Sequence, residues 1–266
     1  MAKKHLGQHF LFDPSILRRI IEAADLSPGD TVVEIGPGHG RMTKMLAGCV
    51  RKVIAVELDR AFCDRLKEEL AGYDNVEIVQ GDALQFPYET LGKFKVVANI
   101  PYYITTPILF RLLEHKDRLG SITMTVQKEV ARRIVAGPGG KDYGVLSLMV
   151  QYRGKAKLAF VVPKGAFRPV PKVDSALVHI ALYGRSAVSV QDERFFFRVI
   201  KTAFSQRRKT LLNSLKPLAA DIREELLRAG VDPARRPETL SIEEFARLSE
   251  SIQKWLEAHP LRGKIQ

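Results

Sequence analysis

The sequence predicts an α/β fold, with a parallel sheet covered by helices on both faces, followed by a small all-helical domain. Two observations support this prediction. In the first two-thirds of the 266 residues, short β-branched runs alternate with stretches of helical periodicity. Residues 192–256 instead show helical periodicity without a convincing strand. We therefore expect two domains, 1–185 and 186–266, joined by a linker at 184–189.

The first helix is expected just after Asp13, a residue type that caps helix N-termini, with Pro14 at the first helical position. The strands that follow are short, β-branched runs. We expect them at 31–35, 52–56, 76–79, 95–98 and 121–126. The intervening helices are expected at 41–46, 61–70, 107–113 (capped by Thr106) and 128–135.

Two further strands are expected beyond this alternation, at 157–162 and 176–182, as an antiparallel edge of the sheet. In the second domain, Ser241 and Glu244 have the spacing of a capping box. We expect them to open a helix that runs to about Trp255.

The composition narrows the class of protein. Hydrophobic residues make up 45% and charged residues 27%, which excludes disorder as the main state. No apolar run is long enough to span a membrane, and the start lacks the apolar segment of a signal peptide. The two cysteines, Cys49 and Cys63, fit a reducing cytosol, and no Cys/His spacing suggests a metal site. We expect a cytoplasmic protein without a metal.

The charge indicates the kind of partner. Lys and Arg number 42 against 30 Asp and Glu, a net charge of +12. Such an excess favours RNA, DNA or an anionic membrane surface. Two segments concentrate it. Residues 203–216 contain basic residues and no acid, and 151–175 contain six basic residues and one acid. These clusters predict phosphate contacts, at Arg153, Lys155, Lys157, Arg207, Arg208 and Lys209.

A glycine turn follows the first strand of the alternating region. Gly36 and Gly38 belong to a G-x-G-x-G pattern, which lets the backbone approach a ligand closely. Glu57 ends the next strand, where a carboxylate can accept hydrogen bonds from both ribose hydroxyls. Asp82 ends the third strand and can bind an adenine amino group. The spacing of the glycines differs from the G-x-G-x-x-G pattern that binds pyrophosphate. Such a turn, together with two acids, suits a cationic nucleoside, and we expect S-adenosylmethionine.

The fourth strand ends in Asn99-Ile100-Pro101-Tyr102. The exocyclic amine of adenine is a poor nucleophile because its lone pair is delocalised into the ring. The Asn99 amide oxygen and the Ile100 carbonyl can each accept one N–H of that amine and so favour a localised lone pair. Pro101 fixes the turn, and Tyr102 offers a flat face for an extruded base.

At these residues the sequence resembles the small-subunit ribosomal RNA adenine dimethyltransferases of the bacterial KsgA type. Further similar segments support the resemblance over nearly the whole chain. They are Gly7-Gln8-His9-Phe10-Leu11, 126–131, 143–147, 167–175 and 204–211. The family often has Asn where His9 stands.

The resemblance implies a Rossmann-like, class I S-adenosylmethionine-dependent methyltransferase domain with a helical C-terminal domain. It also implies two methyl groups on each of two adjacent adenosines near the 3′ end of small-subunit rRNA, added late in assembly to a pre-formed subunit by a monomeric enzyme. It places Phe167 as a second aromatic wall for the target base. The cofactor-binding residues that it implies are Gln8, His9, Leu11, Gly36, Gly38, Glu57, Leu58, Asp82, Ala83 and Asn99.

Two alternatives stay open beside this interpretation. The first is the related enzyme type that methylates large-subunit rRNA; the Lys128-Glu129 segment and the basic helix at 207–209 fit the small-subunit type better. The second is a non-catalytic RNA- or DNA-binding factor of the same fold. The intact tetrapeptide at 99–102 and both acids, Glu57 and Asp82, argue against that loss of catalysis.

Overall fold

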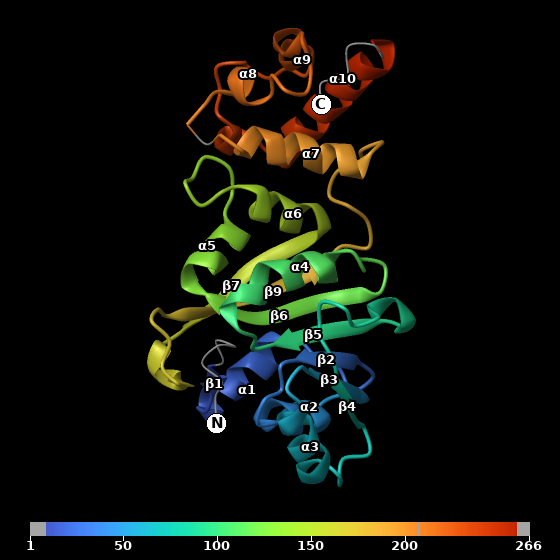
Figure 1. Cartoon of the computed structure of the whole chain (residues 1–266), viewed down its shortest axis with the longest axis vertical. Helices are drawn as coiled ribbons and strands as arrows, with labels where there is room; N and C mark the ends of the chain where they lie inside the picture. The colour runs from blue at the N-terminus through green and yellow to red at the C-terminus, as the bar shows by residue number, and fades with distance from the viewer. Residues whose placement is uncertain (1–8, 207, 260–266) are drawn as a thin grey trace. The chain divides into compact units, whose positions relative to one another are not determined.

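A computed structural model describes residues 9–206 and 208–259, and Figure 1 shows the order of its elements. The chain divides into two compact units. The first comprises 1–131 and 154–184, and the second comprises 132–153 and 185–266. The second unit thus takes in 132–153 besides the C-terminal residues. The division at 185 that the sequence suggests stays a prediction.

The first unit is built on a seven-stranded sheet with the order β4-β3-β2-β5-β6-β9-β7. The first five strands of this order are parallel, and β9 and β7 form an antiparallel edge. Their bounds are β2 Thr31–Ile35, β3 Lys52–Glu57, β4 Val76–Gln80, β5 Phe94–Ala98, β6 Leu119–Gln127, β7 Gly154–Val162 and β9 Ser175–Leu182. The predicted parallel sheet with an antiparallel edge is confirmed.

Helices follow the strands as predicted: α1 Pro14–Ala23, α2 Arg41–Ala47, α3 Arg60–Glu69, α4 Thr105–Leu113 and α5 Lys128–Val135. The Asp13 carboxylate accepts from the backbone N–H of Ser15 and Ile16, so the predicted cap is confirmed. The prediction of Thr106 as a cap is wrong. Helix α4 begins at Thr105, directly after the 3-10 turn η3 (Tyr102–Ile104), and has no side-chain cap. The chain enters this helix already coiled, so no capping side chain is needed to start it.

Strand order decides which face each helix covers. The chain passes from β2 outward to β3 and β4, then returns to β5 on the other side of β2 and continues to β6. Right-handed crossovers therefore place α2 and α3 on one face of the sheet and α4 on the opposite face. The sheet core is made of buried Val and Ile side chains, as β-branched runs predict.

A second, two-stranded sheet was not predicted. Strand β1 (Phe10–Leu11) pairs antiparallel with β8 (Phe167–Arg168), which follows the 3-10 turn η4 (Lys164–Ala166). Strands of two residues carry no periodicity that a sequence pattern can reveal. This pairing brings the start of the described chain to the loop that connects β7 and β9.

The second unit is helical. Its elements are α6 Val145–Arg153, α7 Glu193–Phe204, α8 Leu211–Ser214, α9 Ile222–Arg228, η5 Pro237–Thr239 and α10 Ile242–Ala258. Helix α10 begins with the predicted capping box, in which the Ser241 and Glu244 side chains each bond the other's backbone N–H. Phe196, Phe245 and Trp255 lie in the buried core. No helix within 9–206 and 208–259 is long and apolar enough to cross a membrane.

Candidate active site

The strand order reverses between β2 and β5, which is where ligands bind in open α/β sheets. A pocket of about 680 Å³, open mouth included, lies at the carboxyl ends of β2, β3, β4 and β5. It is lined by His9, Phe10, Ile35, Gly36, Gly38, Val56, Glu57, Leu58, Gly81, Asp82, Ala83, Asn99, Ile100, Pro101, Tyr103 and Ile104.

The glycine turn after β2 forms one wall of the pocket. Gly36 and Gly38 have φ of 72° and 52°, a left-handed conformation that glycine adopts without strain. The Gly36 N–H donates to the Val56 carbonyl at 3.0 Å, which ties the turn to β3. A Cβ at Gly38 would lie 2.7 Å from the Phe10 ring. Glycine is therefore required here for both the backbone conformation and the space.

Glu57 lies at the end of β3, only 5% exposed. Its Oε2 accepts from the Gly38 N–H at 3.1 Å and its Oε1 from the Asp59 N–H at 2.9 Å. Burial raises the pKa of this carboxyl, and backbone N–H groups of Asp59, Gly38 and Leu58 counteract that rise. Each oxygen keeps one acceptor position, and the residue lines the pocket. A vicinal diol fits such a carboxylate.

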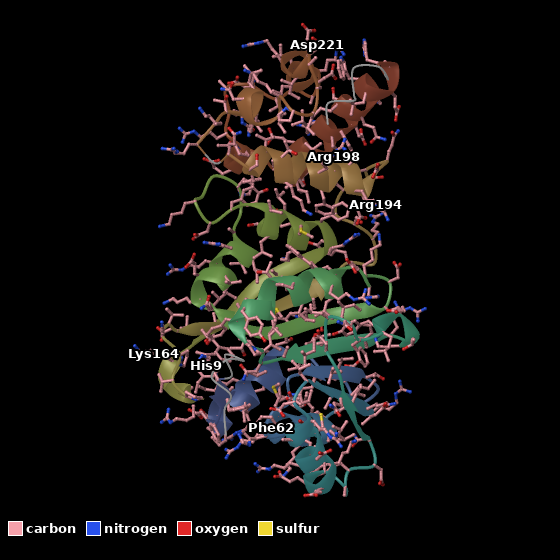
Figure 2. All side chains as sticks on the ribbon, viewed as in Figure 1. His9, Phe62, Lys164, Arg194, Arg198 and Asp221 are labelled. Atoms are coloured by element: carbon pink, nitrogen blue, oxygen red, sulfur yellow. The ribbon has the colours of Figure 1, made fainter. Side chains whose placement is uncertain are left out.

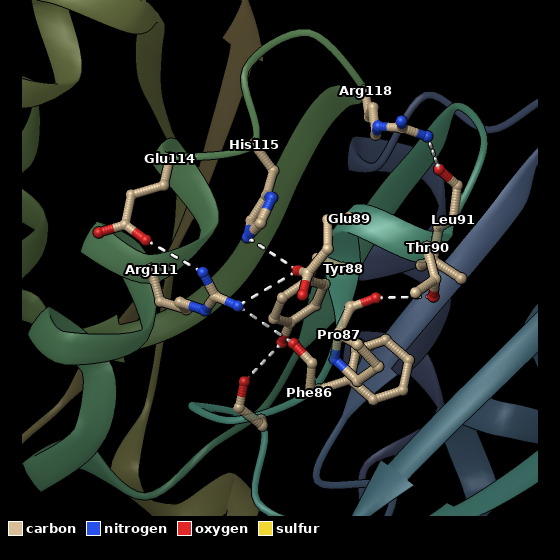
Figure 3. A network of polar contacts seen from close by, with 11 residues as sticks. Phe86, Pro87, Tyr88, Glu89, Thr90, Leu91, Arg111, Glu114, His115 and Arg118 are labelled. Carbon is tan, nitrogen blue, oxygen red and sulfur yellow. Dashed lines mark hydrogen bonds and ion pairs between the residues drawn. The ribbon is translucent and has the colours of Figure 1, made fainter.

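The next wall comes from the loop after β4, and Figure 3 shows the network behind it. Asp82 Oδ1 accepts from the Leu84 N–H at 2.9 Å, which leaves Oδ2 as an acceptor. The Tyr88 hydroxyl, fully buried, donates to the Ala83 carbonyl at 3.0 Å. Arg111 in turn contacts Glu89 and Glu114 at 3.4 and 3.1 Å. The hydrogen bond from Tyr88 thus stabilises the loop that carries Asp82 and Ala83 on the side away from the pocket.

The tetrapeptide after β5 contributes the third wall. Asn99 donates one N–H of its side-chain amide to the His9 carbonyl at 3.3 Å, and its amide oxygen is an acceptor. Ile100 and Pro101 line the same pocket. Tyr102 does not. Its ring stacks on His9 with centroids 5.6 Å apart, and its hydroxyl lies 2.5 Å from the Ser175 hydroxyl.

His9 is labelled in Figure 2. Its Nδ1 atom lies 2.7 Å from the carbonyl oxygen of Pro169. Because a carbonyl only accepts, Nδ1 is the donor. His9 therefore connects the β7–β9 loop, Tyr102 and the pocket. Gln8 lies outside the described residues.

Glu34 was not predicted as a site residue. This residue lies within β2, fully buried, and neither carboxylate oxygen has a hydrogen-bond partner in the described structure. Burial raises its pKa to about 8, with the nearby Glu57 charge adding to the rise and the Thr43 hydroxyl opposing it. Glu34 lines a smaller pocket beside Gly36 and Asn99. A charged residue type inside a β-branched run was the signal in the sequence.

Besides Tyr102, three predicted site residues do not line the main pocket. Leu11 packs in the hydrophobic core and lines the smaller pocket beside Glu34. Phe167 is 1% exposed, packed in the same core by the β1–β8 pairing, so neither ring face is free to stack on a base. Arg153 is 9% exposed, ion-paired with Glu193 and stacked over Tyr152. The roles of Phe167 in base stacking and of Arg153 in RNA binding stay predictions, and neither side chain is accessible in the structure described here.

The other predicted phosphate-binding residues are accessible. Lys155 and Lys157 are exposed on edge strand β7, and Lys164 (labelled in Figure 2), Arg168 and Lys172 are exposed beyond it. In the second unit Arg208 and Lys209 are exposed between α7 and α8. Arg207 lies outside the described residues. Within the described chain, no His, Cys, Asp or Glu side chains are grouped as a metal site requires.

Comparison with known proteins identifies relatives of the chain. The family model described as ribosomal RNA adenine dimethylase matches residues 1–254. The chain is 48% identical to the ribosomal RNA small subunit methyltransferase A of Moorella thermoacetica, covering 95% of this chain and 93% of that one. Its identity to the protein of the same name from Pelotomaculum thermopropionicum is 47%, over 94% and 91% of the two chains.

Solved structures are similar to this chain as well. A dimethyladenosine transferase from Plasmodium falciparum superposes with a TM-score of 0.80 at 28% identity, over 92% of this chain and 98% of that one. The 23S rRNA methyltransferase ErmE superposes with a TM-score of 0.73 at 29% identity, over 92% and 99% of the chains. The fold is that of a Rossmann-like methyltransferase with a helical C-terminal region.

Proposed function

The chain belongs to the ribosomal RNA adenine dimethylase family, and we propose that it methylates N6 of two adjacent adenosines near the 3′ end of small-subunit rRNA. The observation that carries this proposal is the geometry at Asn99. One N–H of its side-chain amide donates to the His9 carbonyl, and its amide oxygen can accept an N–H of the target amine. The relatives at 47–48% identity act on the small subunit by name, which favours that substrate.

The pocket fits S-adenosylmethionine. Glu57 would hold the ribose hydroxyls, Asp82 the adenine amino group, and the glycine turn at 36–38 would allow the backbone to approach. Glu34 adds a buried carboxyl nearby, with no hydrogen-bond partner among the described residues. When bound, this cofactor supplies an electrophilic methyl group on a positively charged sulfur.

The residues of the chain orient the amine. The Asn99 oxygen and the Ile100 carbonyl would each accept one N–H, which localises the lone pair of N6 toward the methyl carbon. Nitrogen becomes acidic only as the new N–C bond forms, so no strong base is needed before attack. Tyr102, held by His9 and Ser175, would stack on the extruded adenine in a fixed orientation.

The identity of the substrate is tested by mass spectrometry of rRNA fragments after incubation with precursor small subunits, large subunits or free rRNA. We expect dimethyladenosine in the small subunit, and more in the assembled particle than in free rRNA. Methylation of large subunits alone would show that the activity is that of the large-subunit type.

We further propose that the protein acts late in assembly on a pre-formed particle, in the cytoplasm, and as a monomer. Sedimentation with and without the particle tests whether it is a monomer.

Asn99→Ala tests the amine-holding role. It removes one acceptor of a transition-state hydrogen bond, which costs about 2.7–4 kcal/mol, so single-turnover methyl transfer should slow roughly a hundred- to a thousandfold. Particle binding should change little because phosphate contacts dominate it. Asn213→Ala, at an exposed position on α8, is the matched control. Cofactor affinity is measured separately, and full activity of Asn99→Ala at saturating cofactor would refute the role.

A further inference from the structure

Consecutive tyrosines follow Pro101, and the structure gives them different surroundings. Tyr102 is held by His9 on its ring face and by Ser175 on its hydroxyl. Tyr103 is 60% exposed, and no hydrogen bond or ring contact from the described chain holds it. Both belong to the 3-10 turn η3, where successive side chains project about 120° apart. The turn therefore directs the second ring away from the first, and it is Tyr103 that lines the main pocket.

Leu58 is the other exposed large apolar side chain that lines the pocket, and it is 55% exposed. It directly follows Glu57, the residue that fits the ribose, and the loop with Asp82 and Ala83 lies beyond. The remaining exposed large apolar side chains of the described chain do not line this pocket. Two unpacked apolar groups at one mouth indicate a ligand with flat apolar faces.

We propose that Tyr103 covers the purine of the cofactor, which lies between its ring and Leu58. The proposal rests on the proposed function, because it takes S-adenosylmethionine as the occupant of the pocket. Stacking on an aromatic ring stabilises a bound base whatever its sequence context, and covering the purine also removes apolar surface from water. Tyr102 then serves the target adenine, and Tyr103 serves the adenine of the cofactor.

The test is calorimetric titration with S-adenosylhomocysteine, which needs no turnover. Loss of the ring in Tyr103→Ala should weaken binding roughly five- to a hundredfold. Tyr103→Phe should retain wild-type affinity, because the ring and not the hydroxyl makes the contact. Tyr73→Ala is the control: Tyr73 is an exposed tyrosine that does not line the pocket. Circular dichroism of each variant reports that it is folded, as expected for an exposed position.

A second ligand locates the effect. Methylthioadenosine lacks the amino-acid end, so Tyr103→Ala should weaken its binding by the same factor as for S-adenosylhomocysteine. A loss confined to S-adenosylhomocysteine would place the ring at the amino-acid end and overturn the proposal. Unchanged affinity with a raised KM for the RNA particle would assign Tyr103 to the RNA and overturn it too. If the wild-type protein binds neither ligand, the proposed function itself fails.

Discussion

Glu57 joins the scaffold of the site to its chemistry. The same carboxylate accepts backbone N–H groups from Gly38 and Asp59, which fixes the glycine turn, and lines the pocket where the ribose is expected. Because Glu57 both fixes the turn and lines the pocket, we expect the site to be sensitive even to a substitution that keeps the size of this side chain. Loss of its negative charge alone should alter ligand affinity without removing the side chain.

Glu57→Gln should lower the affinity for S-adenosylhomocysteine roughly ten- to a hundredfold, because hydrogen bonds to a charged acceptor contribute about 1.5–3 kcal/mol. Calorimetry provides the measurement. Glu77→Gln, on the exposed side of β4, is the control and should bind normally. Normal affinity in a folded Glu57→Gln would remove this residue from the ribose site.

Glu34 predicts a pH dependence of stability. Its pKa is raised to about 8 in the fold from 4.5, so the folded state holds a proton that the unfolded state releases. Its stabilising contribution is complete below about pH 4.5 and is lost as the pH rises toward about 8. The free energy of unfolding of Glu34→Gln should therefore fall less than that of the wild type over this window. Urea unfolding at both ends of the window tests this, with Glu77→Gln as control; parallel pH profiles would contradict it.

At the scale of elements, the β2–α2 turn is shaped by packing as much as by ligand. Gly38 has a positive φ, and the Phe10 ring lies directly against it, so β1 is positioned against the turn. That contact links the small β1–β8 sheet to the pocket wall.

Gly38→Ala should destabilise the fold by about 1–2 kcal/mol from the left-handed conformation alone, and displacement of Phe10 should add to this and weaken cofactor binding. Gly72→Ala, where an added Cβ meets nothing within 4 Å, should be close to neutral. Denaturant unfolding and calorimetry measure the two effects. Equal stability of the two variants would show that the turn adapts.

The alternation of elements was readable from the sequence because each strand is a buried β-branched run and each helix has an apolar face. Strand 31–35 and helix 128–135 were predicted with the bounds that the structure gives them. The burial of Phe167 and Arg153 was not predicted, because a motif or a local charge count does not report burial. Their burial depends on β8 pairing with β1 and on Glu193, forty residues from Arg153 in the chain.

At the scale of the whole molecule, the excess of 42 basic over 30 acidic residues is carried by both units. Lys155 and Lys157 are exposed on β7 in the first unit, and Arg208 and Lys209 are exposed in the second. Phosphate contacts of this kind fix the position of RNA without reading its bases. Binding of the particle and methyl transfer within the pocket should therefore respond to different substitutions.

Each phosphate contact changes the slope of log affinity against log salt by roughly 0.7–0.9. Lys155→Ala/Lys157→Ala and Arg208→Ala/Lys209→Ala should thus each reduce the slope for particle binding by about 1.4–1.8, while single-turnover methyl transfer at saturating particle stays unchanged. Lys52→Ala is the control, because Lys52 is an exposed lysine paired with Glu77 at 2.7 Å. Filter binding over a salt series measures the slope. An unchanged slope in one double variant would remove that cluster from the RNA surface, and a loss of methyl transfer at saturation would show that its charges act in the site itself.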